Sequence, residues 1–405
     1  MNIPAETLRT IAKTHDSFYL YDERSILERT GRLKAAFPSV EFLYSVKCNP
    51  APRVLACIFG QGFGADAASL GEVLRAEQAG LQREQIYYSA PGKTMADIEG
   101  ALSKAVLIAD SLDEIRRIED AAARAGRTEE IGIRINPNFS FYGGPGEASK
   151  FGIDEDQAAA FLREEDCPHV RVTGIHVHLH SQELDAGVLE RYYENLLALA
   201  ERMETGCGLR LAYVNMGSGI GIPYSGEDVP LDVEKLGAAA AEKLEEFRRR
   251  RPGLRLMIET GRYAVGKSGL YGTKVLDRKV SRGKTYIIAK NTLNGFIRPS
   301  VEKMVEHCSR DSRPPMWEPL FTHAGAFGFY TLKEDEPREE VTLVGNLCTA
   351  TDVVAENILL PRLECGDLVV ITNAGAYAAV LSPMQFASQE RPAELFLTAA
   401  GEVLE

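Results

Sequence analysis

The stretch FLYSVKCNP, residues 42–50, places one lysine, Lys47, at the end of a run that otherwise has the composition of a buried strand. A buried ammonium group is costly unless it is paired or used. A lysine whose pKa falls on desolvation is also a good amine nucleophile. The simpler interpretation is that Lys47 has reached the end of its strand and points into water. This stretch alone favours the simpler interpretation, so the decision depends on the ends of the other strands.

Seven further short apolar runs precede residue 265. With the first run they make the expected strands 42–46, 62–67, 86–90, 105–110, 131–137, 172–180, 211–217 and 256–261. They do not alternate strictly between apolar and polar residues, which is typical of strands buried on both faces. Segments between them, such as SLGEVLRAEQAG, have helical spacing and end in glycine, a common stop signal. Eight strand–helix units predict a (β/α)8 barrel, and a doubly wound open sheet is the alternative.

The pattern changes after about residue 266, where turns rather than helices separate the strand-like runs. Four such segments are GLYGTKVLDRKVSRGKTYIIAK, EEVTLVGNLCTA, GDLVVITNAGAYA and AELFLTA. Since helical periodicity is weak there, we expect an all-β second domain, with YLYD near residue 20 as a lone strand that pairs with it. The sequence therefore predicts an α/β protein with an N-terminal strand region (1–22) packing on the β domain, a barrel (23–265) and a C-terminal β domain (266–405). SRDSRPPMWEP, residues 309–319, is rich in proline and charge and is expected to be a loop.

The bulk properties exclude several classes of protein. The 405 residues carry 46 basic and 58 acidic side chains, a net charge of −12, which argues against a nucleic acid or an anionic membrane as the partner. No apolar run approaches the length of a membrane span, and the opening MNIPAETLRT lacks the layout of a signal peptide. We therefore expect a cytoplasmic enzyme. The seven cysteines are far apart and odd in number, so neither a disulfide framework nor a zinc knuckle is indicated.

In a (β/α)8 barrel the active site lies at the carboxyl ends of the strands. Polar and glycine residues of the runs gather at these ends, namely Lys47, Asp66, His178, His180, Gly217, Gly219, Glu259 and Arg262. A single such placement can be accidental, but this convergence over five strands indicates a site. It reverses the interpretation of Lys47.

The glycine loop GSGIG, residues 217–221, is a weak signal by itself. A dinucleotide fingerprint would need a third glycine where Ile222 stands, so that fingerprint fails. Loops after the seventh and eighth barrel strands often bind phosphate through backbone N–H groups. Arg262 could add a bidentate guanidinium contact. The alternative for this loop is a tight turn before a helix.

HVHLH, residues 176–180, is expected to place His176, His178 and His180 on one face of a strand. A shared metal ion is the alternative, but matching ligands are few because the chain has only seven histidines. Stacking under a flat cofactor suits His178 better. Glu259 beside an anion site fits a cofactor that also has a basic ring nitrogen. Pyridoxal phosphate has both, and its aldehyde forms a Schiff base with a lysine, here Lys47.

These motifs resemble the fold-type III (alanine racemase-fold) pyridoxal phosphate decarboxylases, which include the diaminopimelate and ornithine decarboxylases, nearly from end to end. YSVKCNP resembles the family's lysine motif, GADAASLGE its second-strand motif, HVHLHSQ its H-x-H-x-G-S-Q motif, VNMGSGIGIPY its glycine loop and IETGRYAV its E-P-G-R motif. NLCTATD resembles its cysteine block, and GAYAAVLSPMQF its G-A-Y motif. The resemblance implies cofactor contacts from Lys47, Asp66, His178, Ser181, Gly217, Ser218, Gly219, Glu259, Gly261, Arg262 and Tyr377.

The resemblance also implies a mechanism and an assembly. Lys47 would carry the cofactor and later release the product, Glu259 would hold the protonated ring nitrogen, and His178 would stack on the ring. Cys348 would return a proton to Cα after carbon dioxide leaves. The family arrangement is a head-to-tail homodimer in which this cysteine reaches the neighbouring subunit's cofactor. Without the resemblance, Cys348 would be interpreted as a small buried residue.

Departures from the family pattern bear on the substrate. Thr349 stands where diaminopimelate decarboxylases have a glutamate for the distal amine, and Glu302 stands where they have a tyrosine. Arg298 remains and could hold a substrate carboxylate, and Asp352 belongs to the same predicted substrate set. His180, Asn215 and Thr260 are further departures, in place of a glycine, an aspartate and a proline.

These departures, with SAPGKT at residues 89–94, look more like decarboxylases of siderophore and antibiotic pathways. One is the citryl-diaminopropionate decarboxylase of staphyloferrin B assembly. The predicted substrate is therefore an amino acid or conjugate with a distal carboxylate. Diaminopimelate decarboxylation, a metal-dependent barrel hydrolase built on HVHLH, a catalytically silent regulator and a racemase are the alternatives. Retention of Lys47, Glu259, Arg262, Cys348 and Tyr377 argues against a silent regulator, and the Cys348 motif argues against a racemase.

Overall fold

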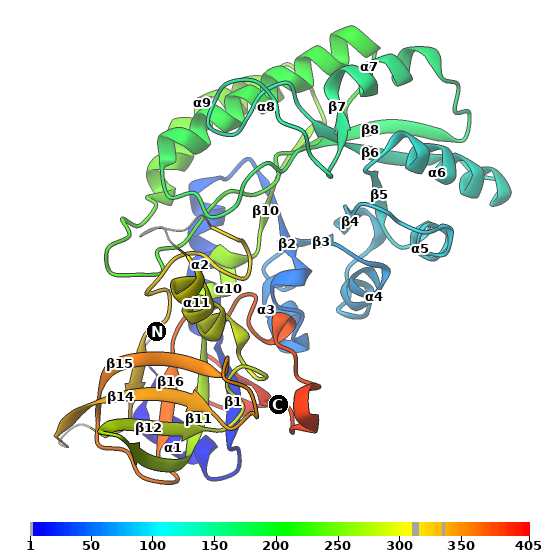
Figure 1. Cartoon of the computed structure of the whole chain (residues 1–405). Coiled ribbons are helices and arrows are strands. Elements are labelled where there is room, and N and C mark those ends of the chain that lie inside the picture. Colours follow the sequence, from blue (N-terminus) through cyan, green and yellow to red (C-terminus); the bar gives the residue numbers. More distant parts are fainter. Residues whose placement is uncertain (1–2, 310–315, 334–336) are drawn as a thin grey trace. The chain divides into compact units, whose positions relative to one another are not determined.

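The computed structural model describes residues 3–309, 316–333 and 337–405 (Figure 1). The chain divides into two compact units. The barrel unit comprises Leu27–Ile222 and Pro230–Gly261, and the β unit comprises Met1–Ile26, Pro223–Val229 and Arg262–Glu405. Of the loop expected at 309–319, residues 310–315 lie outside the described residues. No described helix is long and apolar enough to cross a membrane.

The barrel unit contains a ring of eight parallel strands. They are β2 (Glu41–Ser45), β3 (Gly64–Ala67), β4 (Ile86–Tyr88), β5 (Val106–Ala109), β6 (Glu129–Asn136), β8 (Val170–His176), β9 (Tyr213–Asn215) and β10 (Arg255–Thr260). Pairing of β5 with β6 and of β10 with β2 closes the ring. A short strand β7 (Ile153–Asp154) pairs with β6. The predicted (β/α)8 barrel is confirmed, and the open-sheet alternative is wrong because the ring has no free edge among its eight strands.

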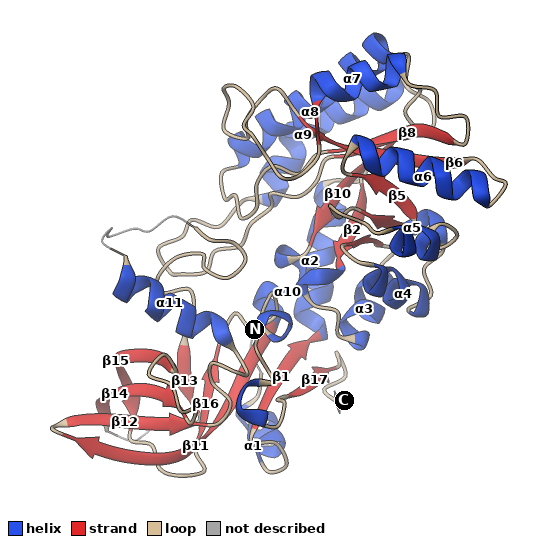
Figure 2. Cartoon of the chain, turned by 45° about the vertical axis from the view of Figure 1, so that its right-hand side comes forward, coloured by secondary structure: helices blue, strands red, loops and turns tan. Residues whose placement is uncertain are grey.

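Helices alternate with these strands. They are α2 (Glu23–Ala36), which precedes β2, then α3 (Pro52–Phe59), α4 (Leu70–Gln78), α5 (Met95–Ala101), α6 (Leu112–Arg124), α7 (Glu155–Glu164), α8 (Ala186–Cys207) and α9 (Val233–Arg249). Figure 2 shows α6, α7, α8 and α9 outside the strands. α6 illustrates how the sequence specifies them, because the Ser111 hydroxyl caps its start by accepting the Glu114 N–H at 3.1 Å. Its Ile115 and Ile118 lie on the buried face.

Large side chains fill the barrel between its strands. Leu43, Tyr87, Val106, Ile108, Tyr213 and Met257 form one buried cluster drawn from five strands. Tyr213 fits because Gly132 and Gly174 lack side chains, and a Cβ added at Gly174 would lie 2.0 Å from the Tyr213 ring. The interior is thus packed, and polar side chains are left for the carboxyl ends of the strands.

The β unit is a mixed sheet. Its strands are β1 (Ser17–Asp22), β11 (Gly269–Ser281), β12 (Lys284–Ala289), β13 (Phe329–Thr331), β14 (Arg338–Gly345), β15 (Val353–Pro361), β16 (Leu368–Ile371), β17 (Ala393–Leu397) and β18 (Val403–Leu404). β11, β12, β14 and β15 lie side by side (Figure 1). β1 pairs antiparallel with β11 and parallel with β17. The core of this sheet comprises Leu8, Ile11, Phe18, Leu20, Leu270, Leu368, Val370, Leu395 and Leu397.

The β unit also contains helices, whereas the sequence pattern there predicted strands and turns only. They are α1 (Ala5–Ala12), α10 (Arg262–Val265) and α11 (Ile297–Cys308). The predicted C-terminal β domain is confirmed as a mixed sheet, and α11 is a helix within it that the sequence pattern did not indicate, for a physical reason. Its buried residues include Arg298, Ser300 and Glu302, so the helix buries polar side chains and shows only a weak apolar stripe in the sequence.

Candidate active site

Lys47 lies just beyond the first barrel strand, in a single 3-10 turn (Val46–Cys48). Its Nζ is 2.5 Å from Oδ2 of Asp66 on β3. The Asp66 side chain is fully buried and also accepts hydrogen bonds from the hydroxyls of Ser45 (2.9 Å) and Ser89 (2.6 Å). The ammonium group is therefore held by a carboxylate that two hydroxyl groups fix in place. The lysine side chain is 42% exposed, so its amine is accessible as well as paired.

The glycine loop follows β9 and needs its glycines for space. Gly217 has φ of 65°, and a Cβ added there would lie 2.2 Å from the carbonyl oxygen of Val177. Gly219 has φ of 129°, in the region that L side chains rarely adopt. A further predicted cofactor residue, Gly261, packs against the turn of Lys47, since its Cβ would lie 3.0 Å from Cβ of Cys48. Close packing therefore requires a glycine beside Val177 at position 217 and beside the turn of Lys47 at position 261.

His178 binds the glycine loop. Its Nδ1 accepts the backbone N–H of Ser218 at 3.0 Å, so Nε2 carries the proton and lies 3.2 Å from the Ser181 hydroxyl. Burial lowers the pKa of His178 to about 3, with Glu259 opposing the shift. The imidazole is thus neutral at physiological pH, as suits a flat ring that stacks on an aromatic cofactor.

The three histidines of HVHLH do not share one face. β8 ends at His176, so His178 and His180 lie beyond the strand and the alternation expected there is wrong. His176 lies against Glu259, whereas His180 stacks on the Phe141 ring (4.9 Å between centroids) and its Nε2 is 3.0 Å from the Tyr142 hydroxyl. No cluster of three potential metal ligands occurs in the described part of the chain. The geometry gives the metal-hydrolase alternative no support.

Glu259, on β10, is a buried acid of the barrel unit. Its Oε1 accepts a hydrogen bond from Nδ2 of Asn215 (2.9 Å) and lies 3.0 Å from Nε2 of His176. Burial alone would raise the pKa of Glu259, but the neighbouring His176, with Lys47 and His178, outweighs burial and lowers the pKa. Glu259 is therefore an ionised carboxylate, 3% exposed, and can hold a protonated ring nitrogen.

The β unit holds two of the predicted phosphate contacts, Arg262 and Tyr377. The guanidinium of Arg262 lies over the Tyr377 ring, 5.1 Å from its centroid. Nη1 of Arg262 donates to the Tyr224 hydroxyl at 2.7 Å, and Nη2 forms an ion pair with Glu318. Arg262 and Tyr377 are thus brought together, as expected of two residues that serve one anion.

Arg298 is a buried cation on α11, only 1% exposed. It donates to the carbonyl oxygens of Leu320 (3.4 Å) and Ala376 (3.3 Å) and to the hydroxyls of Thr322 (3.1 Å) and Tyr224 (3.4 Å). These four acceptors are all uncharged groups. A buried guanidinium in such surroundings is an attractive site for an anion.

Glu302 lies one helical turn beyond Arg298. Its Oε1 accepts the backbone N–H of Gly325 at 2.8 Å, and burial raises its pKa. Glu302 therefore holds the segment around Gly325 in place. Its contact with substrate remains a prediction.

Cys348 is exposed and Thr349 is half-buried, and both lie in the segment between β14 and β15. Asp352, which is 3% exposed, anchors this segment. Its Oδ1 accepts from the Thr292 hydroxyl (2.5 Å) and the Leu293 N–H (3.0 Å), and its Oδ2 accepts from the Leu347 N–H (3.0 Å). Both oxygens thus bind the β unit itself, and a direct substrate contact by Asp352 remains a prediction.

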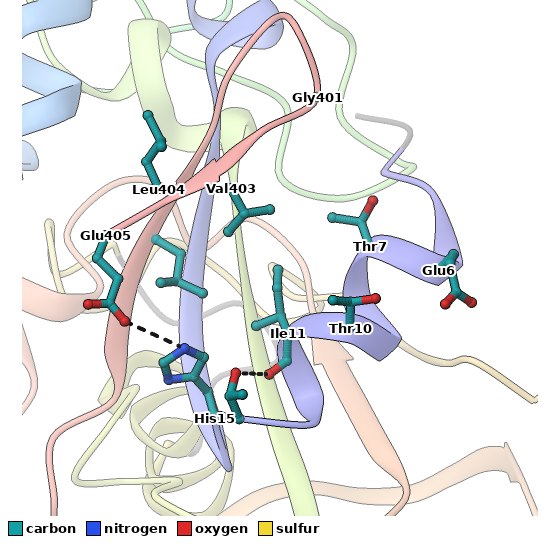
Figure 3. A pocket seen from close by; sticks show the side chains of 11 residues that line it. Glu6, Thr7, Thr10, Ile11, His15, Gly401, Val403, Leu404 and Glu405 are labelled. Carbon is teal, nitrogen blue, oxygen red and sulfur yellow. Dashed lines mark hydrogen bonds and ion pairs between the residues drawn. The ribbon is translucent and has the colours of Figure 1, made fainter.

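A cavity of about 440 Å³ lies elsewhere in the β unit, between α1 and β18 (Figure 3). Ile11, Leu395 and Val403 line its apolar part, and His15 and Glu405 lie at its edge. None of the predicted site residues lines this cavity, so we do not assign the chemistry to it.

Sequence reasoning assigned no site role to four residues that organise the site. Asn215 links Gly217, whose N–H it accepts at 3.0 Å, to Glu259. Tyr224, Glu318 and Thr322 surround the two buried arginines. Tyr224 is the last residue of the glycine loop motif VNMGSGIGIPY, which was a usable signal. Glu318 and Thr322 carried none, because their partners are distant in sequence.

The barrel unit fits a cofactor with an aldehyde and a basic ring, and the β unit, taken by itself, holds a pair of residues suited to an anion. The barrel unit supplies an accessible lysine, an ionised buried acid, a neutral imidazole and a glycine loop in which a Cβ at Gly217 would not fit. The β unit supplies the Arg262–Tyr377 pair. Fold and residues together define an enzyme of the pyridoxal phosphate class built on an alanine racemase-like barrel.

Comparisons with known proteins also indicate a pyridoxal phosphate enzyme. A family model described as "Pyridoxal-dependent decarboxylase, pyridoxal binding domain" matches residues 23–266. The L-glutamyl-[BtrI acyl-carrier protein] decarboxylase of Niallia circulans is 30% identical over 98% of this chain and 92% of that protein. The diaminopimelate decarboxylase of Archaeoglobus fulgidus is 31% identical over 93% and 86%.

A solved structure adds to these relatives. The diaminopimelate decarboxylase of Helicobacter pylori complexed with L-lysine superposes with a TM-score of 0.81 at 26% identity, covering 98% of this chain and 95% of that one. The chain belongs to the pyridoxal-dependent decarboxylase family. It is an amino-acid decarboxylase whose cofactor is pyridoxal phosphate.

Proposed function

We propose that this enzyme decarboxylates an amino acid, or an amino-acid conjugate, that carries a carboxylate at its distal end. The observation that carries the proposal is Arg298, a guanidinium that is 1% exposed and that donates to uncharged oxygens among the described residues. A distal carboxylate would supply the missing counter-charge through charge-assisted hydrogen bonds. Thr349 supports this choice, because a hydroxyl at that position offers no negative charge to a distal amine.

The residues of the barrel unit have separate proposed roles. When bound, pyridoxal phosphate supplies an aldehyde for the substrate amine and a ring that accepts the electron pair released as carbon dioxide leaves. Lys47 holds the cofactor through its amine, and Asp66 orients that amine. Glu259 keeps a proton on the ring nitrogen, since it is ionised. His178 offers the face of a neutral imidazole.

The residues of the β unit complete the proposal. Arg262 and Tyr377 bind the phosphate, with Ser181, Ser218 and the glycine loop of the barrel unit as its other ligands. Cys348 donates a proton to Cα after decarboxylation. Because this thiol is exposed at the end of a strand pair, it suits a head-to-tail homodimer in which it serves the partner subunit. We place the enzyme in the cytoplasm, in a pathway of secondary metabolism such as siderophore assembly.

Two other substrates are supported by the comparisons. The diaminopimelate decarboxylases among the relatives favour diaminopimelate, which ends in a distal amine and carboxylate. The Niallia circulans relative, which by its name acts on a glutamyl group on an acyl-carrier protein, favours a carrier-bound amino acid. A glutamyl group joined to the carrier through its distal carboxyl group would offer Arg298 no free carboxylate.

The deciding experiment measures carbon dioxide release from a panel of substrates. The panel contains citryl-diaminopropionate, meso-diaminopimelate, lysine, ornithine, arginine and a glutamyl group loaded on a carrier protein. The proposal predicts the highest kcat/KM for the carboxylate-bearing conjugate and little activity with lysine or ornithine. A preference for lysine, ornithine or arginine, or for the carrier-bound substrate, would contradict it. A preference for meso-diaminopimelate would keep the distal carboxylate but contradict the assignment to a carboxylate-bearing conjugate of secondary metabolism.

A further inference from the structure

Five side chains of the β unit, two of them arginines, form a closed ring. The Tyr224 hydroxyl accepts from Nη1 of Arg262 (2.7 Å) and from Nη1 of Arg298 (3.4 Å). Glu318 forms an ion pair with Nη2 of Arg262 and accepts the Thr322 hydroxyl at 2.6 Å. Thr322 in turn accepts from Nη2 of Arg298 at 3.1 Å, which completes the ring.

The charges in this ring do not balance. It contains two guanidinium groups and one carboxylate, and its arginines are 6% and 1% exposed. The pKa of Tyr224 reflects this excess of positive charge. Burial raises the pKa of its phenol, but Arg262 and then Arg298 outweigh burial and the pKa is lowered. The ring therefore has an excess of positive charge and favours a further anion.

Glu318 is the one carboxylate that neutralises Arg262 within this ring. Its side chain is 16% exposed, so it reaches the guanidinium from a partly open position. A buried guanidinium without a counter-ion is unfavourable, so Glu318 stabilises the protein in the absence of a bound anion. A carboxylate and a phosphate on one guanidinium would lie within a few ångströms and repel each other.

We propose that Glu318 is an internal anion that competes with the cofactor's phosphate for Arg262 and is displaced when the phosphate binds. The inference rests on the proposed role of Arg262 as a phosphate contact. In this proposal the Glu318 carboxylate keeps the Arg262 guanidinium in place before the cofactor binds, and it lowers the protein's affinity for pyridoxal phosphate. Thr322 supplies a donor that can retain the displaced carboxylate, since its hydroxyl already bonds it.

The test is the affinity of the cofactor-free full-length protein for pyridoxal phosphate, measured by equilibrium dialysis. Glu318→Gln removes the competing charge and keeps the shape, so Kd should fall by about tenfold, the order expected for removing one like charge at this distance. Glu339→Gln is the matched control, because Glu339 forms an ion pair with Arg278 (2.9 Å) in the same unit and should leave Kd unchanged. An unchanged or higher Kd in Glu318→Gln overturns the proposal and makes Glu318 an orienting partner of Arg262.

Thermal unfolding with inorganic phosphate provides a second readout that does not need the cofactor. In the absence of phosphate, Glu318→Gln should unfold at a lower temperature than the wild type. Added phosphate should raise the unfolding temperature of Glu318→Gln by more than it raises that of the wild type. Glu318→Ala should behave alike, which guards against a folding defect peculiar to one variant. An equal gain in wild type and variants contradicts the proposal. If the wild type binds no pyridoxal phosphate, the proposed function itself fails; if it binds normally but the variants do not differ, only the role of Glu318 fails.

Discussion

Replacing Arg298 by methionine tests the proposed substrate class. The methionine keeps the length and apolar stem of the side chain but removes the charge. Because Arg298 is 1% exposed, its bond to a substrate carboxylate would be screened little by water, and a charge-assisted pair of this kind contributes about 2–3 kcal/mol. At about 1.4 kcal/mol per factor of ten, kcat/KM for a carboxylate-bearing substrate should fall roughly 30- to 150-fold.

The assay compares this substrate with its amide analogue. Carbon dioxide release is measured for wild type and Arg298→Met with each substrate, so that any general defect cancels. The amide should lose less than about threefold in kcat/KM, because it never made the charged contact. The variant also loses four hydrogen bonds of 3.1–3.4 Å, which costs about 2 kcal/mol of folding stability and is checked by urea unfolding. Equal losses with both substrates would refute the assignment of Arg298 to the distal carboxylate.

Three further predictions follow from buried groups. Lys93 and Glu114 form a fully buried ion pair at 2.5 Å, so Lys93→Met should lower the free energy of unfolding, measured in urea, by about 3–5 kcal/mol. Adding Glu114→Leu should recover most of this loss. A loss below about 1 kcal/mol in Lys93→Met would contradict the prediction. Asp352→Asn should cost about 1–3 kcal/mol by the same measurement, since Asp352 accepts three hydrogen bonds; no loss would mean that it does not anchor the Cys348 segment. The pKa of His178 is lowered to about 3, against about 6.5 when unfolded, so only the unfolded chain binds this proton between those values. Stability should therefore fall as pH falls from 6.5 towards 3, and less steeply in His178→Phe; identical slopes would show that His178 titrates normally.

The barrel was predictable because its strands are short apolar runs in series, a pattern that few folds share. The helix α11 was not, because it buries Arg298 and Glu302 instead of an apolar stripe. The end of β8 at His176 was also missed. After His176 the chain is held by side-chain contacts, such as the hydrogen bond from the Ser218 N–H to His178. An alternating sequence pattern does not reveal such contacts.

Within the site, predictability followed the distance along the chain. Lys47, Asp66 and Glu259 stand at strand ends, where barrel topology alone brings side chains together. The ring of Tyr224, Glu318 and Thr322 joins segments nearly a hundred residues apart, and each of its residues is common in loops. Such contacts depend on tertiary packing, so no local pattern predicts them.

The central claim is that Lys47 is the lysine that holds pyridoxal phosphate. The most direct measurement is borohydride reduction of the cofactor-loaded protein, followed by peptide mass spectrometry to locate the pyridoxyl group. The account predicts loss of the visible absorption band and a single label on Lys47. A label on another lysine, or a loaded protein that borohydride leaves unlabelled, would contradict it.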